Sequence, residues 1–194
     1  MKHGFKTWAE KEALRLRDEM RLPKDAALPA RSLANHLQIP LATPNDIGVD
    51  EFTLTELLGN STSKCSAMTL YLQGTPFVVF NPTHSDQRQE SDLMHEFGHI
   101  LCKHPPQRVV VGGTLPFPIR EYNAAQEEEA DWLGATLKLP RDALMQAVRR
   151  GFTDDQLAER FHCSVPLARM RKNRSGVVVQ LQRLNQWKQT RGWA

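Results

Sequence analysis

The sequence predicts an α+β fold, because three segments carry a helical period and one segment has the composition of a β-hairpin. The helical period covers about residues 7–21, 86–103 and 123–139. In the hairpin, residues 66–80, the β-branched and aromatic runs SAMTLYL and FVVF flank Gln73-Gly74-Thr75-Pro76. Of the 194 residues, 40% are apolar and 24% are charged, which is typical of a folded globular protein. This length fits one domain, or one domain with a small appendage.

The first part of the chain predicts two helices followed by irregular connections. The first helix runs from about Thr7 to Arg21 and ends at Leu22-Pro23, because a residue before proline avoids helical geometry. A shorter helix is expected over Ala30–Leu37, and the next prolines then favour an extended connection. Residues 45–64 end in a polar run typical of a loop. The candidate buried residues of the first helix are Trp8, Ala13, Leu14, Leu16 and Met20.

The chain after residue 103 predicts one strand and then helices only. A strand is expected over Arg108–Val111 and a Gly/Pro-rich loop over Gly112–Pro118. The helix over about Asn123–Leu139 stops before Pro140, and several short helices follow.

Residues 151–194 differ from the rest in charge and pattern. They contain 8 Lys and Arg against 3 Asp and Glu, a net charge of +5, whereas residues 1–150 contain 17 against 19. Thr153 and Ser164 are candidate caps for two helices, DDQLAERF and the segment ending in LARMRKNR. This spacing resembles a helix–turn–helix. We therefore predict a main domain over residues 1–150 and a basic helical, HTH-like subdomain over residues 151–194.

The composition excludes several classes of protein. No apolar run approaches the roughly 18 residues that span a bilayer, and the first 20 residues mix charges without the apolar stretch of a secretory signal. Cys65, Cys102 and Cys163 are odd in number and scattered, which favours a reducing compartment over a disulfide framework. We therefore expect a cytoplasmic protein that does not bind membranes.

The most informative segment is His95-Glu96-Phe97-Gly98-His99, an H-E-x-x-H pattern on a predicted helix. Two histidines four positions apart lie about 40° apart around a helix, so both imidazoles can reach one ion, and neutral imidazole suits Zn²⁺. Glu96 lies about 100° round from His95, where it can take a proton from water at the metal. The opposite side of the helix is apolar, and Gly98 near the ligand face lets another element approach. This context favours a metal site over two ordinary surface histidines.

A catalytic zinc site needs a third protein ligand, and the later helix offers Glu127-Glu128-Glu129. Glu127 shares a helix face with Ala130, Asp131 and Gly134, two of which are small enough for tight packing on another helix. We therefore predict Glu127 as the third ligand and Asp131 as the acceptor of a ligating histidine's second N–H. An acidic helix N-terminus favoured by the macrodipole would also explain three glutamates, but not the small residues.

Several weaker candidates lie near these motifs. His104 is either a substrate-side hydrogen bonder or a helix-end histidine, and Tyr122 either stabilises an oxyanion or packs. Asp92 is a candidate hydrogen-bond partner of the ligands, and Cys102 is more simply a buried structural cysteine. The histidines without ligand spacing are His3, His36, His84 and His162.

The two motifs HEFGHILCKH and EEEADWLGATLKLP resemble the ImmA/IrrE family of bacterial and phage metallopeptidases. Members carry HExxH and then a helix reading E-x-x-A-[N/D], matched here by Glu127, Ala130 and Asp131. The resemblance covers about residues 65–165, and Arg88 matches an arginine common before the first motif. The chain departs from the family at three positions, where it carries Asp92, Gly134 and Lys138.

The resemblance implies a zincin-like metallopeptidase domain, with a small β-sheet beside the active-site helix, followed by the helical HTH-like segment. Family members are typically zinc-dependent endopeptidases, and those characterised cleave a partner helix–turn–helix repressor. We therefore expect such a repressor as the substrate, and its cleavage to relieve repression of a mobile element or stress response. We also expect a short member without the C-terminal sensor-like domain of the radiation-response proteins.

In the expected mechanism, His95, His99 and Glu127 hold Zn²⁺, while Glu96 acts first as base and then as proton donor. A further hypothesis places the substrate along a free edge of the hairpin at Phe77–Phe80.

Two alternatives to an active peptidase stay open. One is a DNA-binding regulator or toxin–antitoxin partner with a structural or catalytically inert zinc site, and the other is an inert pseudo-peptidase that acts by sequestration. A DNA reader would contact phosphates through basic side chains, but we favour packing of the C-terminal helices on the peptidase core. The basic residues concerned are Arg169, Arg171, Lys172 and Arg174.

Overall fold

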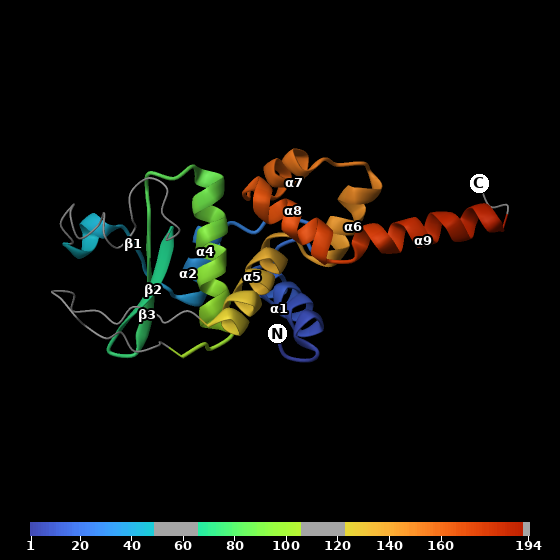
Figure 1. Ribbon diagram of the computed structural model, residues 1–194. Coiled ribbons are helices and arrows are strands. Elements are labelled where there is room, and N and C mark those ends of the chain that lie inside the picture. Colours follow the sequence, from blue (N-terminus) through green and yellow to red (C-terminus); the bar gives the residue numbers. More distant parts are fainter. Residues whose placement is uncertain (49–65, 106–122, 192–194) are drawn as a thin grey trace.

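The computed structural model describes residues 1–48, 66–105 and 123–191, and it confirms the α+β class (Figure 1). Among the described residues we find no helix with the length and apolar character that a membrane span requires. The elements in chain order are α1 (Phe5–Glu19), α2 (Ala30–Leu37), β1 (Leu41–Ala42), the 3-10 helix η1 (Pro44–Ile47), β2 (Ala67–Leu72), β3 (Thr75–Phe80), α4 (Asp86–Leu101), α5 (Ala124–Lys138), α6 (Arg141–Arg149), α7 (Asp154–Phe161), α8 (Val165–Arg174) and α9 (Val177–Thr190).

The predicted helices and the hairpin occur close to their expected positions. The hairpin turns at Gln73-Gly74, and both residues have positive φ angles, of 51° and 83°, as a tight turn requires. The side chain of Thr153 caps α7 by accepting a hydrogen bond from the Gln156 N–H. Ser164 caps α8 in the same way. The predicted strand 108–111 and loop 112–118 lie outside the described residues.

The prediction that Trp8 is buried is wrong, because this side chain is 39% exposed. The buried stripe of α1 consists of Ala9, Ala13 and Leu16, spaced i, i+4 and i+7, and it packs toward α5. Trp8 lies beside this stripe and covers the ring of Phe5, with ring centroids 5.3 Å apart. An amphipathic aromatic residue at the edge of a core satisfies the same sequence pattern as a buried one.

The sheet has the strand order β1-β3-β2, which places β3 in the middle. β3 pairs in parallel with β1, through Leu41 opposite Val78, and antiparallel with β2, through Thr69 opposite Val78. The hypothesis of a free edge at Phe77–Phe80 is therefore wrong, whereas β2, the other strand of the hairpin, lies at an edge of this sheet among the described residues. The hairpin signal in the sequence does not reveal this, because the partner β1 is only two residues long and lies upstream of the hairpin. A proline in β3 would break the sheet whether or not a substrate binds there.

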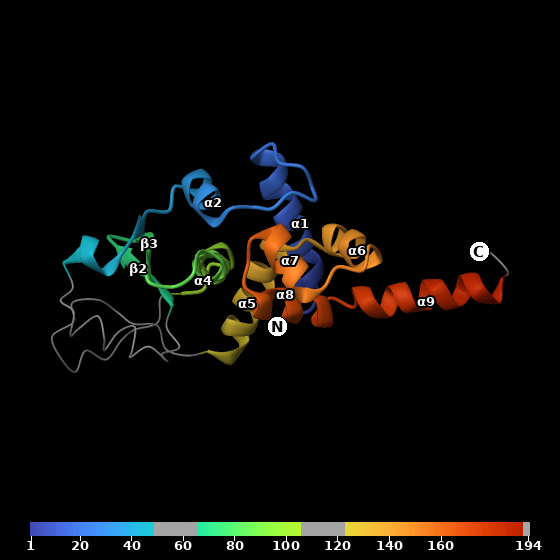
Figure 2. The same cartoon turned by 90° about the horizontal axis from the view of Figure 1, so that it is seen from above.

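Helix α4 is the central element of the first core. It lies between the sheet on one side and α5 on the other, with α2 packed on a further side, while α1 packs on α5 (Figures 1 and 2). Leu93, Met94 and Phe97 are completely buried within this layer. The predicted apolar side of α4 is thus the side that holds it in place, because each such side chain contributes about 1.5–3 kcal/mol by burial.

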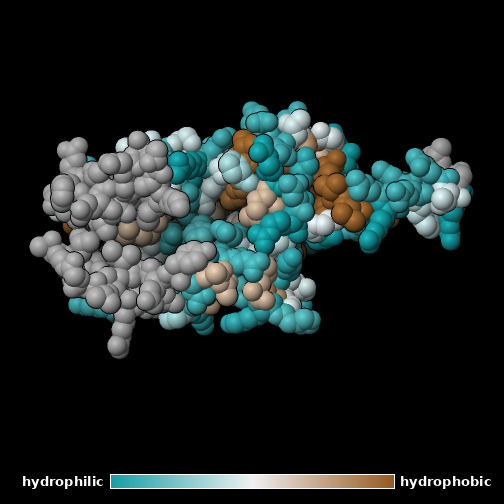
Figure 3. Space-filling model, in the orientation of Figure 1, coloured by the Kyte–Doolittle hydropathy of each residue, from teal (hydrophilic) through white to brown (hydrophobic). Residues whose placement is uncertain are grey.

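A second core joins α6, α7, α8 and the beginning of α9. Its buried residues run from Leu139 to Val177, so α6 packs with the later helices. Helix α9 then projects away from the rest of the described chain (Figure 1). Apolar side chains gather on the surface where α6 meets α9, where Met145 and Leu181 are only partly buried (Figure 3). The predicted division at residue 150 stays a prediction.

A buried ion pair connects the end of α5 to α4. Lys138 is fully buried, and its ammonium donates to the Glu90 carboxylate at 2.5 Å and to the Leu28 carbonyl at 2.9 Å. Glu90 also accepts the Ala30 N–H at 2.7 Å, at the beginning of α2. Burial lowers the pKa of Lys138, and the nearby Glu90 opposes this change. The lysine that departs from the apolar family pattern is thus accommodated by a specific acidic partner.

Replacing Lys138 by Met should lower the free energy of unfolding by about 3–5 kcal/mol, because Glu90 then loses its buried cation and keeps only the partly exposed Arg31 at 3.7 Å. Adding Glu90→Gln, which keeps an acceptor for Ala30, should recover more than half of the loss. Urea denaturation of the two single variants and the double variant measures both effects. As a control, Arg15→Met removes ion pairs on the exposed face of α1 and should change stability by less than about 1 kcal/mol. Equal effects of Lys138→Met and Arg15→Met would contradict the prediction.

Candidate metal centre

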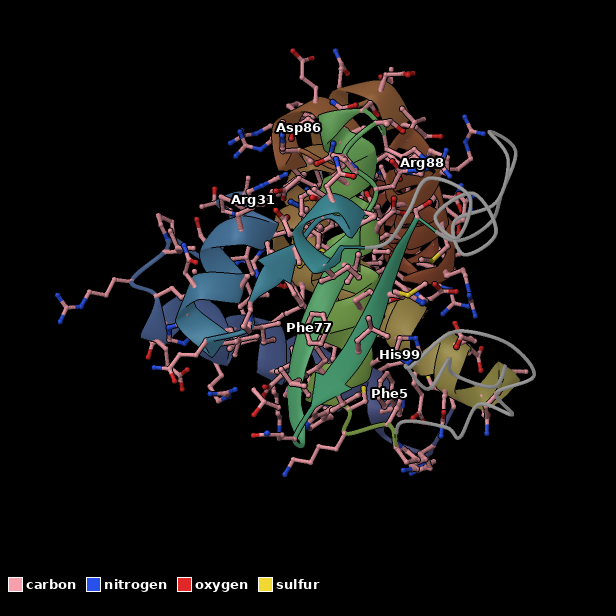
Figure 4. All side chains as sticks on the ribbon, turned by 90° about the vertical axis from the view of Figure 1, so that its left-hand side faces the viewer. Phe5, Arg31, Phe77, Asp86, Arg88 and His99 are labelled. Carbon is pink, nitrogen blue, oxygen red and sulfur yellow. The ribbon has the colours of Figure 1, made fainter. Side chains whose placement is uncertain are left out.

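Two histidines of α4 project from the same helix face. His95 and His99 are one turn apart, and their Nε2 atoms lie 3.0 Å from each other. His99 is almost completely buried, whereas the His95 side chain is 28% exposed. Figure 4 shows His99 beside α5, in the half of α4 away from Asp86 and Arg88. The helical geometry inferred from H-E-x-x-H is therefore present in the fold.

Glu127 of α5 reaches the same point. Its Oε2 atom lies 3.2 Å from His95 Nε2 and 3.6 Å from His99 Nε2. Neighbouring donors around a tetrahedral ion with bonds of about 2.0–2.1 Å lie about 3.3–3.4 Å apart. The three donor atoms therefore fit one Zn²⁺-sized cation. Within the described residues, this is the group of His, Cys, Asp and Glu side chains arranged to hold a metal ion.

Asp131 lies one turn after Glu127 and contacts the far side of the His95 ring. Its Oδ1 atom is 2.8 Å from His95 Nδ1. A carboxylate here accepts the Nδ1–H, which leaves Nε2 of His95 as the lone-pair atom directed at Glu127 and His99. This is the arrangement that the helix face of Glu127, Ala130, Asp131 and Gly134 predicts.

Glu96 lies beside the three donors and is only 7% exposed. The hydroxyl of Thr69 donates a hydrogen bond of 2.6 Å to Glu96 Oε2. Thr69 belongs to β2, so the sheet fixes one oxygen of this carboxylate. Sequence reasoning missed Thr69. The available signal was one threonine within a largely apolar strand, and it does not identify a partner 27 residues away.

The weaker candidates have different positions. His104 is 8% exposed and lies behind His99, with its two ring nitrogens directed at His99 and Glu129, so it is placed away from a substrate. Tyr122 lies outside the described residues. Asp92 pairs with His84 at 3.5 Å and Arg88 at 3.8 Å.

The other cysteines and histidines have structural surroundings. Burial raises the pKa of Cys102 to about 12, and the residue packs against the first core. His36 contacts Glu19, and His162 contacts Asp86. The other two glutamates of α5 also have partners away from the donor group, since Glu128 pairs with the N-terminal amine and with Arg174, and Glu129 is buried beside His104.

Two glycines set the distance between α4 and α5. A Cβ atom on Gly98 would lie 2.6 Å from the Ala130 carbonyl oxygen, and one on Gly134 would lie 2.7 Å from the Met94 carbonyl oxygen. Both obstacles are backbone atoms, which cannot rotate aside. The prediction that Gly98 admits another element is confirmed. Gly134, which departs from the usual family residue, serves the same close approach from the opposite helix.

Gly98→Ala and Gly134→Ala should each lower the free energy of unfolding by about 1–3 kcal/mol, because the helices must separate. Helix propensity alone predicts the opposite sign, a gain of about 0.8–1 kcal/mol. Urea denaturation of the metal-free protein decides between the two. Zinc affinity should fall in both variants, since the histidines and Glu127 belong to different helices, and a stabilised variant with unchanged affinity would contradict the close-contact explanation.

Comparison with known families places this geometry in context. The sequence profile of the IrrE N-terminal-like domain, of the peptidase M78 type, matches residues 53–173, which include both motifs. Comparisons with curated proteins and with solved structures gave no significant match. Peptidases of this type are metal-dependent, and the group formed by His95, His99 and Glu127 is a possible site for the ion. The match covers more than half of the chain, and we conclude that the chain belongs to the IrrE N-terminal-like family of metallopeptidase domains.

Proposed function

We propose that the chain is a zinc-dependent endopeptidase, with His95, His99 and Glu127 as metal ligands and Glu96 as the catalytic acid and base. The observation that carries this proposal is the convergence of three donor atoms, separated by 3.0–3.6 Å, next to a buried carboxylate. A zinc ion held there would polarise the scissile carbonyl and lower the pKa of water. The histidines and Glu127 have the donor chemistry of a catalytic zinc site.

The chain's own residues account for the proton transfers. Glu96 takes a proton from the attacking water and then delivers it to the nitrogen of the leaving peptide, so the proton count balances in peptide hydrolysis. The Thr69 hydroxyl holds Oε2 of this carboxylate and leaves Oε1 for the water. Asp131 holds the ring of His95 in position.

We further propose that the substrate is a helix–turn–helix repressor, whose cleavage relieves repression of a mobile element or stress response. This part of the proposal is supported by the family membership and its implied partner. The direct test is to incubate the zinc-loaded protein with the helix–turn–helix protein encoded beside it, and to identify the products by mass spectrometry. An intact repressor after prolonged incubation, alongside cleavage of another protein substrate, would reject the repressor while retaining the peptidase.

Glu96→Gln should retain bound zinc and lose cleavage by at least about 10²-fold, because the amide cannot accept the proton. Zinc content is measured by elemental analysis and cleavage by product formation. Glu19→Gln, on the exposed end of α1, is the matched control and should leave both quantities unchanged. A Glu96→Gln protein with full activity would show that Glu96 is not the catalytic base. If the variant lost its zinc, the loss of activity would follow from the missing metal and not from the missing base.

The alternative of a DNA-binding regulator is not favoured by the contacts of α8. Arg171 is buried, donates to the Leu139 carbonyl at 2.9 Å and pairs with Glu10. Arg169 and Lys172 both pair with Asp154 of α7. The fourth basic residue, Arg174, pairs with Glu128. All four cations thus pair with carboxylates of the same chain, and the pairs of Arg171 with Glu10 and of Arg174 with Glu128 support packing of the C-terminal helices on the peptidase core.

We expect the full chain to bind duplex DNA no more tightly than a Kd of about 10⁻⁶ M at physiological salt, within the non-specific range. A gel-shift titration at several salt concentrations measures this. Much tighter, salt-sensitive binding that disappears in an Arg169→Ala, Lys172→Ala double variant would instead support the regulator.

A further inference from the structure

We propose that His104 and Glu129 are positioning residues that hold His99 in the tautomer and ring orientation needed for metal binding. His99 Nδ1 lies 2.8 Å from His104 Nδ1, and His104 Nε2 lies 3.3 Å from Glu129 Oε2. The three side chains therefore form a continuous chain, called here the His99 relay. The inference rests on the proposed metal centre and extends it to two residues outside the H-E-x-x-H and Glu127 ligand set.

The end of α4 folds His104 back onto its own helix. The His104 N–H donates to the His99 carbonyl at 3.0 Å, and the Lys103 N–H donates to the Ile100 carbonyl at 3.0 Å. Lys103 has a φ angle of 54°, in the left-handed region. These are the two hydrogen bonds and the conformation of a Schellman cap. The cap reverses the direction of the chain at residue 103. A continued helix would place His104 away from the ligand face, but the reversal brings its ring against the buried side of His99.

The hydrogen-bond roles along the relay follow from its ends. When His99 uses Nε2 toward the ion, its Nδ1 carries the hydrogen and donates it to His104 Nδ1. His104 then carries its hydrogen on Nε2, which faces the Glu129 carboxylate. Glu129 also accepts the Lys2 backbone N–H at 3.0 Å. The Glu129 carboxylate at the end of the relay thus contacts two donors, the Lys2 N–H and His104 Nε2.

The relay that holds His99 is buried, whereas Asp131, which holds His95, is exposed. The side chains of His104 and Glu129 are each 6% exposed, whereas the Asp131 side chain is 53% exposed. Water can replace Asp131 at His95, but it has little access to the buried side of His99. An apolar residue at position 104 would remove the acceptor that His104 offers to the buried Nδ1–H of His99, which favours the wrong tautomer or a rotated ring.

The experiment compares zinc affinity in His104→Leu and His104→Asn. Leu removes the acceptor, while the Asn side-chain oxygen can stand where His104 Nδ1 stands. By chelator competition we expect about a 10–100-fold weaker Kd for zinc in His104→Leu and a change below about 3-fold in His104→Asn. The visible spectrum of the Co²⁺-loaded protein should change in the Leu variant only. Thermal unfolding of the metal-free proteins shows whether each variant is folded.

A second variant keeps the test decisive if His104→Leu does not fold. Glu129→Gln is nearly isosteric and should also weaken zinc binding, whereas Glu128→Gln on the same helix should not. Folded variants that bind zinc and Co²⁺ as the unmodified protein does would overturn the relay and leave the proposed peptidase intact. Absence of zinc binding by the unmodified protein would overturn the metal centre, and with it both proposals.

Discussion

The close contact between α4 and α5 is the constraint on which the candidate centre depends. The two histidines belong to one helix and Glu127 to the other, so the distances of 3.2 and 3.6 Å between their donor atoms exist only while the helix backbones touch. Metal–ligand distances tolerate deviations of about 0.2 Å, far less than the width of a methyl group. Gly98 and Gly134 are therefore as much part of the centre as the donors themselves, although neither can bind an ion. The apolar side of α4 and the α1 stripe hold this contact from outside.

Reasoning from the sequence succeeded for residues inside regular helices, because the spacing of residues along a helix fixes the direction in which each side chain points. His95, His99, Glu127 and Asp131 all lie inside α4 or α5, and their phases around those helices suffice to place them on facing sides. It failed where the position of a side chain depends on an irregular segment or on a strand that is distant in the sequence. His104 follows a capping turn whose left-handed residue is Lys103, and no glycine marks this turn in the sequence. Thr69 contacts Glu96 across the interface between the sheet and α4, and the order of strands depends on a two-residue partner. Periodicity contains no information on such contacts.

The end of α5 explains how the two cores are joined. Pro140 stops the helix, which leaves its last carbonyls without helical partners. Buried cations from other helices satisfy them, since Arg17 donates to the Leu137 carbonyl at 2.7 Å and Arg171 to the Leu139 carbonyl at 2.9 Å. Burial lowers the pKa of Arg17 to about 10 and also lowers that of Arg171. The negative end of the helix dipole favours both cations at this place. Arg171, a basic residue of the C-terminal segment, thus contributes to the fold around the peptidase motif.

The three functional groups of α4 are each held by a different neighbour. Asp131 of α5 holds His95, the relay beyond the α4 cap holds His99, and Thr69 of the sheet holds Glu96. Exposure differs sharply among the donors, because the His95 and Glu127 side chains are 28% and 20% exposed whereas His99 is 3% exposed. In the described part of the chain, solvent therefore reaches the centre from the side of His95 and Glu127. Under the proposed function, a peptide would approach from this same side, since His99 and its relay occupy the buried side. Water can replace Asp131, which holds His95 on the exposed side, whereas His104 and Glu129, which hold His99, are buried in the core.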